Sequence, residues 1–118
     1  MSLRFIILFH DGVPQPHFDL MFETAPGSKL TTWQSPVWPL LQPAILTRIE
    51  DHRRDYLEYE GPVSDNRGQV KRVSSGTCTI TCFDDDIFWT IRFANRSFPN
   101  LHLKNGVDDK WLAMFDCH

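Results

Sequence analysis

The chain has 118 residues, of which 42% are hydrophobic, and its formal net charge at pH 7 is −3. This length and apolar content predict a single folded domain, residues 1–118, and exclude a disordered chain. The negative charge argues against nonspecific wrapping of nucleic acid, but it leaves room for a small basic pocket that grips one phosphate.

Short segments of alternating apolar and polar residues predict strands along the whole chain. The segments between them carry turn residues such as Gly12, or prolines such as Pro36, Pro39 and Pro43 that impose an extended, irregular path. No long stretch has helical periodicity. The expected strands are residues 3–9, 17–23, 30–33, 44–50, 56–60, 69–73, 76–83, 87–93, 101–103 and 111–115. This pattern predicts an all-β fold with little helix, either an antiparallel barrel of about eight strands or a sandwich.

The three cysteines, Cys78, Cys82 and Cys117, have no CxxC spacing, and an odd number does not suit a disulfide framework. Cys78 and Cys82 alternate with threonines, so we expect both thiols in the core. This use of cysteine predicts a reducing, cytoplasmic setting. The apolar run at residues 5–9 is too short for a signal peptide, and no stretch approaches the ~20 apolar residues of a membrane helix, so no membrane association is expected.

A candidate metal site lies where the first expected strand ends and the second begins. His17 and Asp19 are two residues apart on a strand, so they share a face, with a separation along the chain of about 7 Å. His10 ends the preceding strand and can approach them. Imidazole and carboxylate ligands together suit Mn²⁺, Zn²⁺ or Fe²⁺. We therefore predict a divalent metal site on His10, His17 and Asp19.

Two kinds of chemistry fit such a site. His17, Asp19 and the distant His102 match the two-histidine, one-carboxylate triad of Fe²⁺ oxygenases built on β-barrels. Alternatively, His52 and Tyr56 approach the open side of the metal, where they bind and protonate a phosphate oxygen while the metal polarises it.

An ordered set of residues along nearly the whole chain favours the second interpretation. The set consists of His10, Asp11, His17, Phe18, Asp19, Leu20, Glu23, Trp33, Pro36, Glu50, Asp51, His52, Tyr56, Glu60, Gly61, Gly68 and the closing stretch at residues 110–115. In this order the residues resemble the 3′-phosphoesterase domain of bacterial DNA ligase D.

The resemblance implies a compact β-barrel with its site in a groove, and Mn²⁺ as the usual ion on His10, His17 and Asp19. It implies that His52 and Tyr56 contact the scissile phosphate. The family removes a terminal ribonucleoside and then a phosphate from nucleic-acid 3′ ends in DNA repair. This chain has no ligase or polymerase module, so the resemblance implies a stand-alone version, with such repair proteins acting in trans.

The chain departs from the family at three positions where the family has phosphate-gripping cations, which are Met21, Val37 and Ala44 here. A charge-assisted contact to an anion contributes roughly 1.5–3 kcal/mol, so losing three would weaken binding or turnover by orders of magnitude. Arg48, Arg53 and Arg54 are the candidate replacements. The departures leave open a catalytically weakened module that binds metal and phosphate without turnover.

Overall fold

The computed structural model describes residues 2–94 and 98–116. Its strands and one short 3-10 helix, η1, follow the chain in the order β1 (Leu3–Asp11), β2 (His17–Glu23), β3 (Leu30–Ser35), β4 (Ala44–His52), η1 (Arg54–Leu57), β5 (Gly61–Pro62), β6 (Gln69–Phe83), β7 (Phe88–Phe93), β8 (Leu101–Asn105) and β9 (Lys110–Phe115). No helix within these residues has the length and apolar character needed to cross a membrane.

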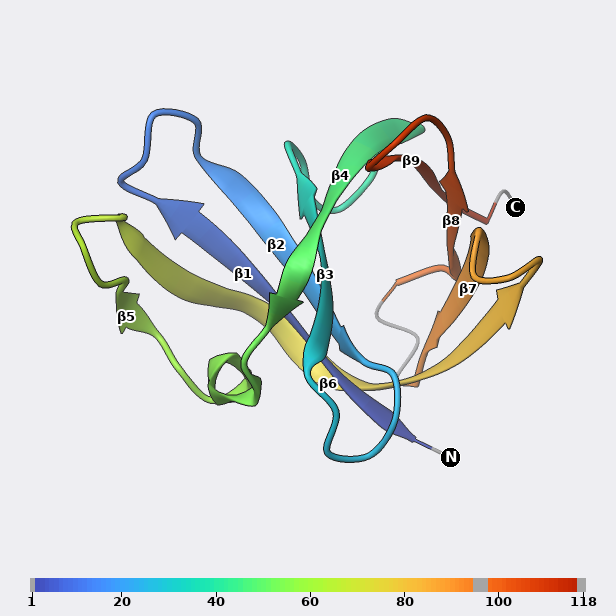
Figure 1. Cartoon of the computed structure of the whole chain (residues 1–118), viewed down its shortest axis with the longest axis horizontal. Coiled ribbons are helices and arrows are strands. Elements are labelled where there is room, and N and C mark those ends of the chain that lie inside the picture. The colour runs from blue at the N-terminus through green and yellow to red at the C-terminus, as the bar shows by residue number, and fades with distance from the viewer. Residues whose placement is uncertain (1, 95–97, 117–118) are drawn as a thin grey trace.

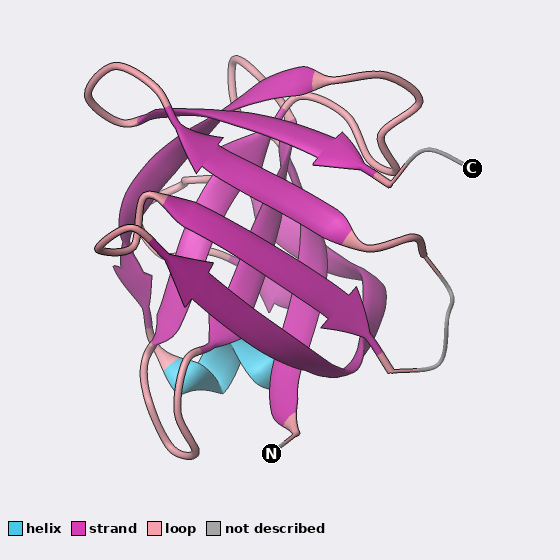
Figure 2. Ribbon diagram, turned by 90° about the vertical axis from the view of Figure 1, so that its right-hand side faces the viewer, coloured by secondary structure: helices cyan, strands magenta, loops and turns pink. Residues whose placement is uncertain are grey.

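Eight of these strands close into an antiparallel barrel (Figures 1 and 2). Their order around the ring is β1-β2-β3-β4-β9-β8-β7-β6, and pairing of β6 with β1 closes it. The two-residue β5 pairs with the start of β6 on the side away from β1. The prediction of an all-β antiparallel barrel with little helix is therefore confirmed.

Two local predictions are wrong. Residues 69–83 form one continuous strand, because the expected turn at residues 74–76 stays paired with β1 and the bend is made instead by a bulge at Val73. Residues 56–60 do not form a strand. They begin in η1, where the short helix turns Tyr56 and Leu57 into an apolar cluster on the outside of the barrel.

The described residues form two apolar clusters, one on each face of the β1–β2 sheet. The first fills the barrel around Trp33, whose indole makes edge-to-face contacts with Trp89 and Trp111. The second lies outside the barrel, beneath η1 and the residues that follow it, and comprises Ile6, Leu8, Met21, Leu30, Leu57 and Val70. Strands β1 and β2 are thus buried on both faces.

The cysteines are only partly as expected. Cys78 is buried, and burial, with a smaller contribution from the charge of Glu23, raises its thiol pKa to about 12. Cys82 is exposed, so the expectation of a core thiol is wrong for this residue. It lies near the end of β6, where that strand has left β1 and pairs only with β7, so fewer neighbours cover it than cover Cys78. Cys117 lies outside the described residues.

Candidate metal site and its pocket

The pairing of β1 with β2 brings the predicted metal ligands together. His10 lies opposite His17 in the register, and Asp19 is the next residue along β2 on the same outer face. One ligand atom from each of His10, His17 and Asp19 lies within 4.8 Å of the others. The distance from His17 Nε2 to Asp19 Oδ1 is 3.2 Å, and that from His10 Nδ1 to Asp19 Oδ2 is 3.7 Å.

Backbone carbonyls fix which ring nitrogen of each histidine faces the carboxylate. His17 Nδ1 donates to the carbonyl of Gln15 at 2.9 Å, and His10 Nε2 donates to that of Arg67 at 2.6 Å. In the neutral imidazoles the opposite nitrogens then present lone pairs toward Asp19. Metal-ligating histidines are oriented by the same kind of bond from their second nitrogen. The group therefore fits a divalent cation.

The carboxylate side of the group is buried. Asp19 is 3% exposed, and its Oδ1 and the facing His17 Nε2 are both shielded from solvent without an aligned hydrogen bond. The close side-chain contact with Asp19 raises the pKa of His17, although burial acts in the opposite direction. Two acceptors that face each other in a buried space need a proton or a cation between them.

The second half of the predicted site lies across a small cavity of about 90 Å³. His10 and Asp19 line one side, and His52 and Tyr56 line another, with ring centroids 5.5 Å apart. A bulge in β4 directs His52 there: Ile49 pairs with Thr32 but His52 pairs with Leu30, so β4 has one extra residue. Bulges of this kind redirect a side chain to the other face.

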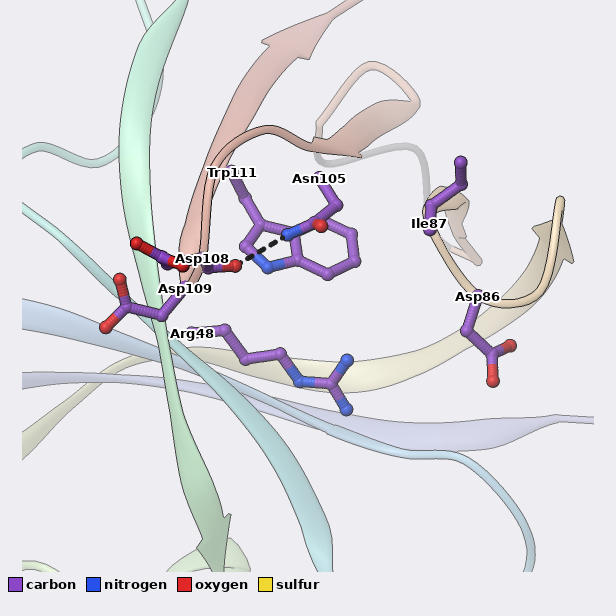
Figure 3. A pocket seen from close by; sticks show the side chains of 7 residues that line it. All are labelled: Arg48, Asp86, Ile87, Asn105, Asp108, Asp109 and Trp111. Atoms are coloured by element: carbon purple, nitrogen blue, oxygen red, sulfur yellow. Dashed lines mark hydrogen bonds between the residues drawn. The ribbon is translucent and has the colours of Figure 1, made fainter.

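Two of the three candidate replacement arginines are held elsewhere. Arg48 points into the barrel, where its guanidinium carbon lies 5.4–5.7 Å from the ring centroids of Trp33, Trp89 and Trp111. Figure 3 shows this side chain extending from β4 across a separate cavity in the direction of Asp86. Arg54 bonds Glu23 and the carbonyl of Ser28.

Of the remaining positions considered from the sequence, which are Arg53, Met21, Val37 and Ala44, only Met21 lines the metal-site cavity. Arg53 is exposed beside His52. Met21 is buried in the wall of the metal-site cavity, whereas Val37 and Ala44 line a different, apolar groove. The cation that does line the cavity is Arg67, which sequence reasoning missed because it falls in a charged loop without a recognisable motif.

His102 does not join the metal group. It lies on β8, which pairs with β7 and β9, and not with β1 or β2. Its Nδ1 is 3.1 Å from Thr90 Oγ1, and its Nε2 contacts Asp116. The arrangement required by the Fe²⁺-oxygenase interpretation is therefore not formed.

The fold and the site together define a small β-barrel protein with a candidate divalent-metal site beside a polar pocket. A cation held by His10, His17 and Asp19 would face a space whose lining residues include His52, Tyr56 and Arg67. Such a set can bind an oxyanion and exchange a proton with it. Comparison with protein-family models and with curated protein sequences finds no match.

Proposed function

We propose that the protein is a metal-dependent phosphoesterase, similar to the 3′-end-processing domain of DNA ligase D, that acts on a nucleic-acid 3′ end or another phosphate ester. The observation that carries the proposal is that one cavity is lined by His10, Asp19, His52 and Tyr56. These residues come from three separate segments that the resemblance had assigned to one site.

The roles of the residues follow from their hydrogen bonds. A divalent cation, expected to be Mn²⁺, would withdraw charge from a phosphoryl oxygen when bound. His52 Nδ1 is occupied by the carbonyl of Glu50 at 3.0 Å, which leaves Nε2 to exchange a proton with an oxygen of the ester. The Tyr56 hydroxyl is a hydrogen-bond donor for a second phosphoryl oxygen.

The cellular setting is part of the same proposal. Cys78 and Cys82 are free thiols, and such use of cysteine is usual in a reducing compartment, so we propose a cytoplasmic protein. A repair ligase or polymerase acting in trans would use the trimmed 3′ end.

The proposal is tested by release of phosphate or nucleoside from a primer-template that ends in a 3′-ribonucleotide or a 3′-phosphate. We expect turnover that depends on Mn²⁺ and is abolished by Asp19→Ala. His52→Gln should lower kcat by roughly 100-fold or more, in line with loss of a general acid, while Mn²⁺ binding by calorimetry is retained. No turnover of any phosphate monoester or diester in the presence of metal would reject the proposal.

A second candidate function is a binding module that holds metal and phosphate without turnover. It is favoured by Met21, an apolar residue in the cavity wall at a position where the family has an arginine. Calorimetry that detects binding of both Mn²⁺ and phosphate, without hydrolysis, would support it. Failure to bind either would remove it.

A further inference from the structure

Among the described residues that line the metal-site cavity, Arg67 carries the only permanent positive charge. The other lining side chains are two imidazoles, a carboxylate, a phenol and the apolar groups of Met21, Val63 and Val70. A charge-assisted donor binds an anion about twice as strongly as a neutral donor does. Arg67 is placed to supply such a donor.

The loop that carries Arg67 is fixed to the barrel. Val63 N donates to the carbonyl of Gly68 at 2.8 Å, which closes the loop. Gly68 then packs so closely on β1 that a Cβ there would lie 2.0 Å from the carbonyl oxygen of Asp11. The Arg67 side chain bonds Ser64 through Nε and Nη2, at 2.9 and 3.2 Å. Because a guanidinium has five N–H donors, donors remain for a ligand.

The backbone of Arg67 also contacts one of the candidate metal ligands, His10. Its carbonyl accepts the bond from His10 Nε2 at 2.6 Å. One residue therefore orients a candidate metal ligand with its backbone carbonyl, and its exposed side chain carries a positive charge beside the same cavity. The bond between the Arg67 carbonyl and His10 therefore fixes the position of this loop relative to the candidate metal site.

We propose that Arg67 binds a phosphoryl oxygen of the ligand and takes the role of the absent family cations, an inference that rests on the proposed function. A divalent cation and the Asp19 carboxylate sum to one positive charge, and Arg67 adds a second, which matches a phosphate dianion. The cavity of about 90 Å³ is far smaller than the roughly 300–1,000 Å³ of pockets that enclose a drug-sized ligand. It takes the phosphoryl group, and the rest of the ester stays outside.

The test is calorimetric titration of inorganic phosphate into the Mn²⁺-loaded protein. Arg67→Gln should weaken phosphate binding roughly 10- to 100-fold, the range expected for one charged hydrogen-bond partner. Arg67→Lys should retain part of the phosphate affinity, because the positive charge remains although the paired N–H donors of the guanidinium are lost. The matched control is Arg53→Gln, which removes an exposed positive charge beside His52 and should change phosphate affinity less than threefold.

Mn²⁺ binding, titrated first, should be nearly unchanged in Arg67→Gln because His10 bonds the backbone carbonyl. The inference is overturned if Arg67→Gln binds phosphate as tightly as the wild type does. It is also overturned if Arg53→Gln loses as much phosphate affinity as Arg67→Gln, or if the wild type binds no phosphate. Turnover is measured separately. If phosphate binding depends on Arg67 but no turnover is found, the inference holds and the phosphoesterase proposal is rejected. If turnover is found and is unchanged in Arg67→Gln, the phosphoesterase proposal holds and the inference is rejected.

Discussion

Glu23 is a buried carboxylate with a structural role, unlike Asp19, the other buried carboxylate among the described residues, which lies in the candidate metal site. The Glu23 carboxylate is 4% exposed and accepts from the backbone N–H of Arg4 at 2.7 Å and from Arg54 Nη1. Burial alone would raise the pKa of Glu23, but these bonds outweigh it and lower the pKa. Glu23 therefore ties η1 to the first two strands and does not act in the cavity.

Glu23 should make the free energy of unfolding depend on pH in acid. A folded-state pKa below the unfolded value, which is about 4.3, means that the stabilisation is fully present above that pH. It is lost as the pH falls through the folded-state pKa. We expect Glu23→Gln to destabilise the protein by about 1–3 kcal/mol at pH 7 and to flatten this acid dependence. Urea unfolding between pH 3 and 7 measures both; parallel curves for the two proteins would contradict the assignment.

The grouping of His10, His17 and Asp19 could be predicted from residue identities, whereas the position of Arg67 at the cavity could not. His17 and Asp19 share a face through strand alternation, which the sequence displays. Arg48 alternates in the same way, yet its side chain lies inside the barrel against three indoles. Arg67 reaches the cavity only because its loop folds back onto β1, a contact between residues far apart in the chain. Such contacts leave no local pattern.

At the scale of elements, the closeness of the loop at residues 63–68 to β1 sets the shape of the cavity. Gly68 has φ +78°, and Gly27 in the β2–β3 turn has φ +83°. A Cβ on Gly27 would meet no atom within 4 Å, whereas one on Gly68 would clash with Asp11. A substitution at Gly27 therefore tests backbone strain alone, whereas one at Gly68 tests strain together with a steric clash.

We expect Gly27→Ala to cost about 1–2 kcal/mol, the strain of a left-handed residue. Gly68→Ala should cost at least twice as much, because the loop must also move off β1. That movement displaces the carbonyl of Arg67 from His10, so Mn²⁺ affinity should fall roughly 10- to 100-fold, as for loss of other groups that orient metal ligands. Urea unfolding and Mn²⁺ calorimetry test both variants. Equal effects from the two substitutions would show that the close approach is unimportant.

The short helix η1 is held to the barrel by Leu57, which is 4% exposed in the outer apolar cluster. Leu57→Ala should destabilise the protein by about 2–5 kcal/mol and loosen Tyr56, while the metal ligands on β1 and β2 remain in place. Leu41→Ala is the matched control, because Leu41 is 96% exposed and its loss should cost no more than about 0.5 kcal/mol. Chemical unfolding compares the two. A similar small loss for both would show that η1 does not depend on this contact.

Strand positions were predictable where alternation is uninterrupted, as in β2, whose bounds match the expected residues 17–23. Strand positions were not predictable where tertiary packing changes the register. The bulge in β4 turns His52 toward the cavity, and the bulge in β6 replaces an expected turn. Residues 56–60 alternate like a strand, but burial of Leu57 favours a helical turn there. Two of these exceptions, at His52 and at Tyr56, involve residues that line the cavity of the candidate site.

For the whole molecule, the closed ring explains why the site forms on one wall of the barrel. The pairing of β1 with β2 on one side and with β6 on the other fixes the strand that carries His10. The outer cluster then covers the same wall and leaves a small polar space at its end. Alternation predicted the all-β class, whereas the ring order and the burial of β1 and β2 on both faces depend on contacts across the whole chain.

Because His10, His17 and Asp19 meet only when β1 and β2 pair, metal binding should stabilise the fold as a whole. A ligand that binds the folded state adds RT ln(1 + [L]/Kd), or about 2.7 kcal/mol at one hundred times Kd, less whatever the unfolded chain binds. We expect Mn²⁺ to raise the unfolding midpoint and a chelator to reverse the shift. Asp19→Asn keeps the side-chain volume and should abolish the shift, whereas Asp51→Asn, at an exposed carboxylate beside His52, should preserve it. Since the readout is unfolding and not turnover, a shift that survives Asp19→Asn would place the metal elsewhere on the protein.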